Sequence, residues 1–141
     1  MLFLLNYFLF TVMKFILVFF FFLFSMLGCS KLNDSEKPVI TILSPNPNDT
    51  IPASTSEVIL QFTATDNTAL SSLSLEINDT NGNNFFTDSK ELDGEKYSYK
   101  NSFMIVKHPT KTKALIFSIQ LTDENKNQVI SNSTFYISPS K

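Results

Sequence analysis

The residues of this chain that can carry chemistry are few, and most of them offer oxygen atoms. The chain has one cysteine, Cys29, and one histidine, His108. No second thiol or imidazole is present to complete a zinc site or a nucleophile–base pair, so the sequence predicts a protein that is not an enzyme. The carboxylate and amide side chains remain, and they include two runs at 66–67 and 123–127.

Carboxylate and amide oxygens of this kind suit calcium, which takes roughly six to eight oxygen ligands. The candidates are Asp66, Asp123, Asn125 and Asn127. Each run follows a predicted strand, and Asp and Asn are also the residues that close turns by hydrogen-bonding to nearby backbone. The turn interpretation is favoured. No metal or other cofactor is therefore assigned, and calcium is kept as the alternative.

Apolar and polar residues alternate with a period of two along most of the chain. The alternation is clearest at Val58–Ala64, Leu73–Ile77 and Leu115–Leu121, and it is typical of strands with one buried face. Turn-forming Pro, Asn, Asp and Gly residues separate the runs. The sequence predicts seven strands, near 38–43, 57–65, 71–78, 84–88, 96–106, 113–122 and 128–137.

Seven short strands predict an all-β antiparallel sandwich, because a sheet with one apolar face needs a second sheet to cover it. Three segments resemble the bacterial Ig-like and fibronectin-III-like domains of secreted and lipid-anchored proteins: PVITILSPNPNDTI, LQFTATDNTALSSLSLEI and FSIQLTDENKNQVIS. The resemblance implies an Ig-like β-sandwich over residues 38–138. It also implies that the loops at 66–67 and 123–127 lie at the same end of the sandwich.

Residues 1–28 differ in composition from the rest of the chain. They hold 23 apolar residues and a single charge, Lys14, whereas all thirteen acidic residues follow Cys29. A lysine, a long apolar run and small residues in this order are typical of a secretory signal peptide. We expect residues 1–28 to be a signal peptide whose true start is Met13. An uncleaved membrane helix is the alternative.

The sequence Met26-Leu27-Gly28-Cys29 resembles a bacterial lipobox. The resemblance implies cleavage between Gly28 and Cys29 and acylation of Cys29, and the following Ser30 favours the outer membrane. Two or more acyl chains anchor a protein stably, whereas one does so only marginally. Residues 29–37 then form the lipidated cysteine and a polar tether. Its eight residues after Cys29 span at most about 29 Å, so the domain is expected to lie close to the membrane.

The charge of the mature part argues against nucleic acid as a partner. Ten lysines, no arginine and thirteen acidic residues give it a net charge of −3, without a basic cluster. The predicted partners are the membrane, through the anchor, and another envelope protein. A glycan-binding accessory role is the alternative, with Phe85, Phe86 and Tyr136 as its aromatic candidates.

Two surface features complete the predictions. Asp49-Thr50-Ile51 resembles a bacterial O-glycosylation motif, with Thr50 as the acceptor. Lys107, Lys111 and Lys113 flank a predicted turn, and we expect them to form a solvated loop. Contact with anionic lipid headgroups is the alternative for these lysines.

Overall fold

The computed structural model describes Met13 and residues 34–55, 57–105 and 109–139. Gly28, Cys29 and the rest of the predicted signal peptide apart from Met13 lie outside these residues, as does His108. In the part of the chain that is described, no helix has the length and apolar character that a membrane crossing requires. A compact unit begins at Asp34, and all of the strands described below belong to it.

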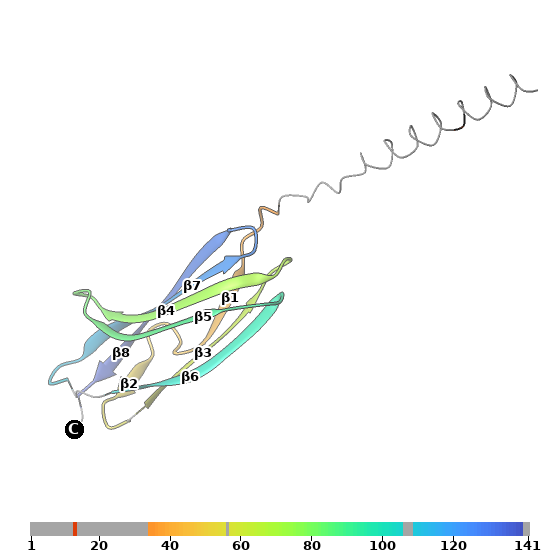
Figure 1. The fold of residues 1–141 in the computed structure, drawn as a ribbon. Coiled ribbons are helices and arrows are strands. Elements are labelled where there is room, and N and C mark those ends of the chain that lie inside the picture. Colours follow the sequence, from red (N-terminus) through yellow and green to blue (C-terminus); the bar gives the residue numbers. More distant parts are fainter. Residues whose placement is uncertain (1–12, 14–33, 56, 106–108, 140–141) are drawn as a thin grey trace, which may run out of the picture. The chain divides into compact units, whose positions relative to one another are not determined.

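Eight strands form two sheets within the described ranges (Figure 1). Sheet A has the order β1-β3-β6 and sheet B the order β2-β8-β7-β4-β5. The strands are β1 (Val39–Ser44), β2 (Thr50–Pro52), β3 (Glu57–Thr65), β4 (Leu70–Asp79), β5 (Asn84–Glu91), β6 (Lys96–Met104), β7 (Lys113–Asp123) and β8 (Gln128–Ser138). The predicted all-β sandwich is therefore confirmed.

The eighth strand, β2, corrects the prediction of seven. The chain leaves sheet A at the cis Ser44–Pro45 peptide bond and turns at Asn48, whose φ is 69°. It then joins sheet B, where β2 pairs in parallel with β8 and Thr50 lies opposite Tyr136. A strand of three residues is too short to show an alternating pattern, so the sequence indicated only a bend here.

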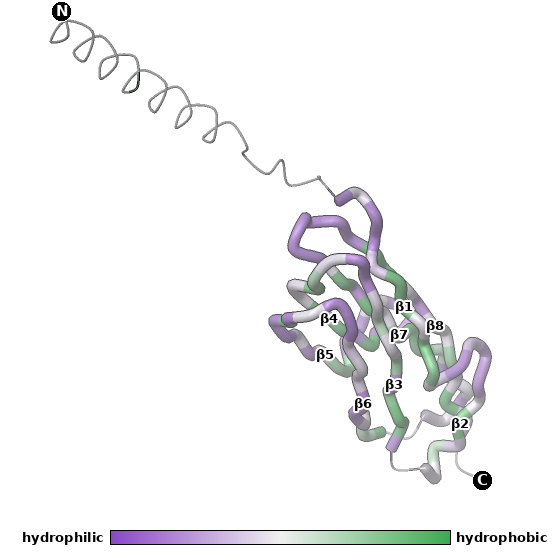
Figure 2. The backbone as a smooth tube through the Cα atoms, turned by 90° about the vertical axis from the view of Figure 1, so that its right-hand side faces the viewer, coloured by the Kyte–Doolittle hydropathy of each residue, from purple (hydrophilic) through white to green (hydrophobic). Residues whose placement is uncertain are grey.

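The core is built from the alternating residues that the sequence indicated. Val58, Leu60 and Phe62 of β3 are 2% exposed or less, and the residues between them face outward. Figure 2 shows hydrophobic residues concentrated along the strands and hydrophilic residues in the loops. The other fully buried side chains come mainly from sheet B and include Leu75, Ile77, Phe117, Ile119, Leu121 and Phe135.

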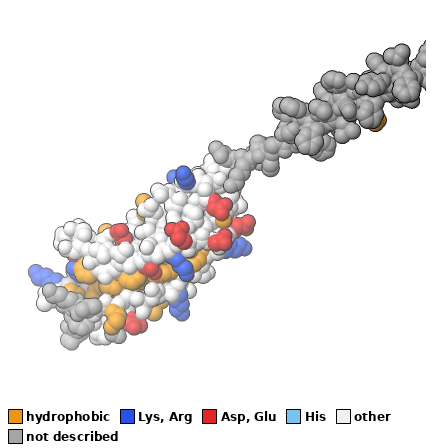
Figure 3. All heavy atoms as spheres, viewed as in Figure 1, with side chains coloured by type: hydrophobic (Ala, Val, Ile, Leu, Met, Phe, Trp, Pro, Cys, Tyr) orange, Lys and Arg blue, Asp and Glu red, His pale blue; other side chains and the backbone are white. Residues whose placement is uncertain are grey.

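The inner face of edge strand β5 packs against edge strand β6 of the other sheet. The rings of Phe86 and Phe103 meet edge to face, with centroids 6.4 Å apart. The Tyr99 hydroxyl donates to Asp88 Oδ2 at 2.8 Å, and burial raises the pKa of Tyr99 to about 12. Figure 3 shows a band of hydrophobic side chains along this side of the domain. An inward-pointing charge such as Asp88 on an edge strand also discourages pairing with a foreign strand.

Candidate functional site

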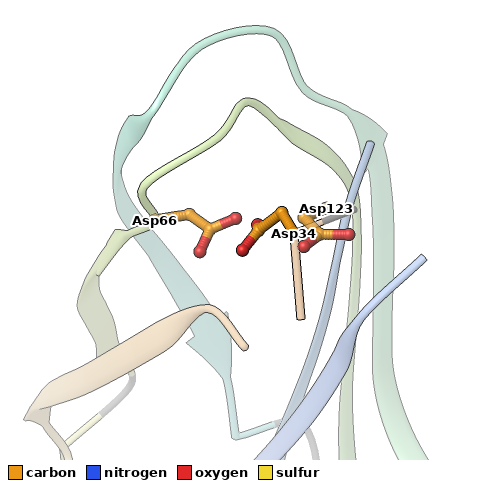
Figure 4. A group of neighbouring side chains, drawn as sticks. All are labelled: Asp34, Asp66 and Asp123. Atoms are coloured by element: carbon orange, nitrogen blue, oxygen red, sulfur yellow. The ribbon is translucent and has the colours of Figure 1, made fainter. Parts of the chain in front are cut away.

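Three carboxylates converge at the end of the sandwich where β1 begins. Asp34 precedes β1, Asp66 follows β3, and Asp123 is the last residue of β7. One oxygen of each lies within 4.8 Å of the other two, and the three side chains point toward one another (Figure 4). The structure thus brings together two predicted residues and adds Asp34, which the sequence interpretation placed in the tether.

The buried member of this aspartate cluster, Asp123, is held by its own turn. It is 1% exposed. Asn127 donates its backbone N–H to Oδ1 and its Nδ2 to Oδ2, both at 2.7 Å. Asn127 Nδ2 also donates to the Asp34 carbonyl at 3.1 Å. Asn127 therefore presents a nitrogen to the cluster, which is the opposite of what a calcium ligand presents.

Asp34 and Asp66 share the hydroxyl of Thr68. Thr68 Oγ1 lies 3.1 Å from Asp34 Oδ2 and 3.0 Å from Asp66 Oδ2. A hydroxyl has one proton to donate, so it serves one carboxylate at a time. Asn67 Nδ2 donates to Asp34 Oδ1 at 3.0 Å, and this bond is the largest cause that lowers the pKa of Asp34. Asn125 also directs a nitrogen inward, with its Nδ2 3.5 Å from Thr68 Oγ1.

The aspartate cluster has ligand atoms that a hard cation accepts, since Ca²⁺ prefers carboxylate oxygens. Among the described residues, the only ion pair joins Lys113 to Asp79 at the other end of the domain, so no lysine neutralises these three acids. Oxygens of all three carboxylates nevertheless already accept hydrogen bonds, from Asn67, Thr68 and Asn127. These hydrogen bonds explain the aspartate cluster without an ion. They close the β7–β8 turn and hold the segment around Asp34 on the domain.

We call this fastening the tether clamp: Asp34 with Asn67, Thr68 and Asn127. The Asp34 side chain, five residues before β1, bonds to Asn67 and Thr68 in the β3–β4 loop, 33 and 34 positions later. Its carbonyl accepts from Asn127, 93 positions later. The polar stretch 30–37 contains two acids, Asp34 and Glu36, and nothing local distinguishes Asp34 from a solvated residue. Only the fold shows that it is held.

A second feature lies at the opposite end of the sandwich, where β7 begins. It is an apolar hollow of about 310 Å³ between the two sheets. Its lining comes from β5, β6, β7, β8 and the segments next to β6 and β7, namely Asn84, Phe85, Phe103, Met104, Ile105, Pro109, Lys113, Leu115 and Ile137.

Lys113 and Phe85 shape the rim of the apolar hollow. Lys113 Nζ lies 4.2 Å from the centroid of the Phe85 ring and 2.9 Å from Asp79 Oδ2. Asp79 also accepts from the backbone N–H and the Nδ2 of Asn83. The Asn83 side chain and then Lys113 are the largest causes that lower the pKa of Asp79. The aromatic ring is therefore held under a cation that is itself held by a turn.

This arrangement changes the expectation for the lysines near the predicted turn. Lys113 is not a solvated loop residue, because it opens β7 and its side chain is 37% exposed and paired. Lys111 is exposed, as expected. Lys107 lies outside the described residues.

The three aromatic candidates for glycan contact are not gathered on one face. Phe85 lines the apolar hollow and is 40% exposed. Phe86 faces inward onto Phe103. Tyr136 is half-buried and alternates with the buried Phe135 and Ile137, which places it on the outer face of β8. These residues do not form the shared platform that the glycan hypothesis requires.

Thr50, the predicted O-glycosylation acceptor, is exposed at the start of β2. Its neighbour Asp49 accepts hydrogen bonds from Asn46 N–H and Nδ2 at 2.8 and 3.2 Å. The position is accessible, and modification there stays a prediction.

Comparisons with known proteins agree on the fold. Residues 38–115, more than half of the chain, match the family model described as "Bacterial Ig domain". The structure is similar to the periplasmic chaperone SfaE, with a TM-score of 0.53 and 11% sequence identity over 73% of this chain and 58% of that one. CopC from Methylosinus trichosporium OB3b is 15% identical with a TM-score of 0.46, over 73% of this chain and 97% of that one.

At 11% identity, the likeness to SfaE describes architecture alone. This chain spans 58% of the length of SfaE. No curated protein matches the sequence.

Proposed function

This chain belongs to the bacterial Ig domain family, and on that premise we propose that it is a non-enzymatic, lipid-anchored binding protein of the bacterial envelope. In this proposal Cys29 carries the lipid at the outer membrane, and the Ig-like domain holds another envelope protein. The lipobox at 26–29 supports the anchor. The observation that supports protein binding is the apolar hollow with its exposed aromatic rim.

Several properties make the apolar hollow suitable for an apolar side chain of a partner. Its walls include Phe103, Leu115 and Ile137, which belong to the buried core and are therefore rigid. Phe85 is fixed at the rim by Lys113 and does not have to be ordered on binding. A pre-organised apolar pocket beside an exposed aromatic residue is typical of the points where protein interfaces concentrate their affinity.

The charges around the apolar hollow indicate the chemistry of the partner. The Asp79 carboxylate is 2% exposed and is already paired with Lys113, so it presents no free negative charge to a binding partner. Lys111 is exposed and lies between the lining residues Pro109 and Lys113. A segment that presents an apolar side chain next to a carboxylate would therefore complement this rim. Glycan capture is not proposed, because the aromatic candidates are separated.

The anchor is tested by mass spectrometry of the protein purified from membranes, wild type beside Cys29→Ala. We expect the mature wild-type chain to begin at Cys29 with added acyl mass, and the variant to be unprocessed. A wild-type chain that keeps its N-terminal segment and carries no lipid would show that the protein is not a lipoprotein.

The binding role is tested by site-specific photocrosslinking in intact cells. A photoreactive phenylalanine analogue replaces Phe85 at the apolar hollow. The matched control replaces Thr87, which is exposed on the same strand but alternates onto the outer face. We expect a discrete adduct with an envelope protein from position 85 only. The same products from both positions, or none, would contradict the proposed role of the apolar hollow.

A further inference from the structure

The outer face of sheet A carries most of the exposed large apolar side chains of the described domain, set among polar Thr, Ser and Gln residues. From residue 34 onward, six large apolar side chains are exposed among the described residues, and four lie on this face. They are Val39 at 61%, Leu43 at 44%, Ile59 at 41% and Met104 at 61%. They alternate with inward-facing neighbours along β1, β3 and β6. They are spread along the face from the Val39 row to the Met104 row. Exposed apolar residues that gather on one face can mark a contact surface.

The outer face of sheet B is different in character. It is formed mainly by Ser, Thr, Asn and Gln side chains that alternate with the core residues of β4, β7 and β8. Its one exposed large apolar residue is Ile130. Its charged residues in the strands are Glu76 and Glu91, both exposed, and the described strands place no lysine there. The two outer faces therefore share a polar background and differ in their exposed large apolar side chains and lysines, most of which lie on sheet A.

Sheet A carries positive charge beside its apolar residues. Lys96 and Lys100 of β6 are exposed and alternate with the inward-facing Tyr97 and Tyr99. Lys96 lies in the same cross-strand row as Val39, through Thr65. The one acid of this face, Glu57, lies at the far end of β3 opposite Met104. The end of the face nearest the tether is thus both basic and apolar.

The tether determines which end of the domain the lipid would hold. The tether clamp fixes Asp34 on the domain. Asp34 is five residues after Cys29, so the chain between them spans at most about 18 Å. The row that contains Val39 and Lys96 begins five residues after Asp34. An anchor on Cys29 would therefore hold the basic, apolar part of the face within reach of the bilayer.

The loops at the same end favour contact by the face of sheet A rather than by the end of the sandwich. They carry Asp34, Glu36, Asp66, Asp93, Glu95, Asp123 and Glu124 against Lys37 and Lys126. Pressing this acidic end onto anionic headgroups would be repulsive. Lying on sheet A instead places Lys96 and Lys100 against the headgroups and buries apolar side chains in the interface.

We propose that the outer face of sheet A, with Val39, Leu43 and Ile59 beside Lys96 and Lys100, docks on an anionic lipid surface. The inference rests on the lipid anchor of the proposed function. It does not require a strong contact, because a lipid on Cys29 makes docking intramolecular and raises the effective concentration of the surface. The outer face of sheet B is then turned away from the membrane.

The experiment uses the full lipidated protein in vesicles of phosphatidylglycerol and phosphatidylcholine, and in vesicles of phosphatidylcholine alone. Acylation blocks the Cys29 thiol, so one added cysteine is the single reactive thiol. Ser98→Cys reports on the outer face of sheet A, and Asn132→Cys is the matched control on sheet B, since both positions are exposed. Reaction with a water-soluble maleimide is measured in detergent and in vesicles.

We expect anionic vesicles to slow the reaction at position 98 by about fivefold or more and to leave position 132 unchanged. Adding Lys96→Glu and Lys100→Glu should remove the protection, and circular dichroism checks that this variant is folded. Equal rates at both positions in protein that floats with the vesicles would overturn the docking inference and leave the anchor intact. Protection of position 98 in native membranes but not in vesicles would also overturn it, in favour of a protein partner.

A different result would overturn the lipid anchor itself. Protein that carries no acyl mass and does not float with vesicles would overturn the proposed function, and the docking inference with it.

Discussion

Two turns at opposite ends of the sandwich have the same design and different surroundings. Asp79-Thr80-Asn81-Gly82-Asn83 joins β4 to β5, and Asp123-Glu124-Asn125-Lys126-Asn127 joins β7 to β8. In each, an aspartate accepts the backbone N–H and the Nδ2 of the asparagine four residues later. In each, the fourth residue has positive φ, 82° at Gly82 and 70° at Lys126.

The difference between the two turns lies in what faces the aspartate. Asp79 faces the Lys113 ammonium, whereas Asp123 faces the carboxylates of Asp34 and Asp66. The turn alone therefore accounts for a buried aspartate with both oxygens engaged, and a bound cation is not needed to explain Asp123. What the turn does not account for is the accumulation of negative charge at one end of the domain.

The largest effect should come from removing the aspartate of a turn. Asp123→Ala removes, at a buried position, the carboxylate that accepts from the backbone N–H and the Nδ2 of Asn127. We expect it to lower the free energy of unfolding by about 3 kcal/mol, because hydrogen bonds to charged groups are strong and unmatched buried donors are costly. Urea unfolding measures the change, with Asn132→Ala as an exposed control. A loss equal to that of the control would mean that the turn does not hold the β7–β8 connection.

The second prediction concerns how the stability provided by the Asp79 turn depends on pH. The pKa of Asp79 is lowered in the folded state, by the Asn83 side chain first and by Lys113 second. Its charged form therefore stabilises the fold above its unfolded pKa of about 4, and this stability is lost as the pH falls through the folded pKa.

Asp79→Asn should thus lower the melting temperature at neutral pH, and the gap to wild type should narrow below about pH 4. Melting curves across the acidic range test this. A gap that is independent of pH would show that the Asp79 charge is not what stabilises this end.

Exchanging the residues with positive φ should give a smaller effect of opposite sign in the two turns. Gly82→Ala should destabilise the protein by about 1 kcal/mol, because a side chain disfavours this backbone conformation. An added Cβ at Gly82 meets no atom within 4 Å, so packing does not contribute. Lys126→Gly should stabilise the fold by about 0.5 kcal/mol, less than the full strain because glycine also gains entropy when unfolded. Loss of stability in Lys126→Gly would contradict the equivalence of the turns.

The smallest effect should come from the aspartate cluster. Asp66→Asn removes one like charge, and we expect a gain of about 0.3 kcal/mol that disappears at high salt. Millimolar calcium should leave the melting temperature of the wild type unchanged. A calcium-dependent rise that Asp66→Asn abolishes would instead assign the cluster to a cation.

The sequence alone was sufficient for seven of the eight strands and for most of their alternation between buried and outward-facing residues. The alternation through Val58, Leu60 and Phe62 identified β3 with its bounds, and the Asp and Asn residues placed the turns. These features are local, since they follow from the period of a strand and from the hydrogen bonds that short polar side chains make to nearby backbone. The convergence of Asp66 and Asp123 was also expected, once the sheet topology was inferred from the family resemblance.

Only the tertiary structure decided the role of residues whose partners are distant along the chain. The sequence placed Asp34 in the tether, whereas in the structure it is held on the domain by hydrogen bonds from Asn67 and Asn127. Phe85 and Phe86 are adjacent and look alike, but an irregularity in the β4–β5 register sends one to the apolar hollow and the other onto β6.

The character of each outer face is likewise a sum over strands that are far apart in sequence. Val39, Ile59 and Lys100 share the outer face of sheet A only because β1 and β6 both pair with β3. Period-two alternation determines which residues leave the core, but strand order determines which of them become neighbours.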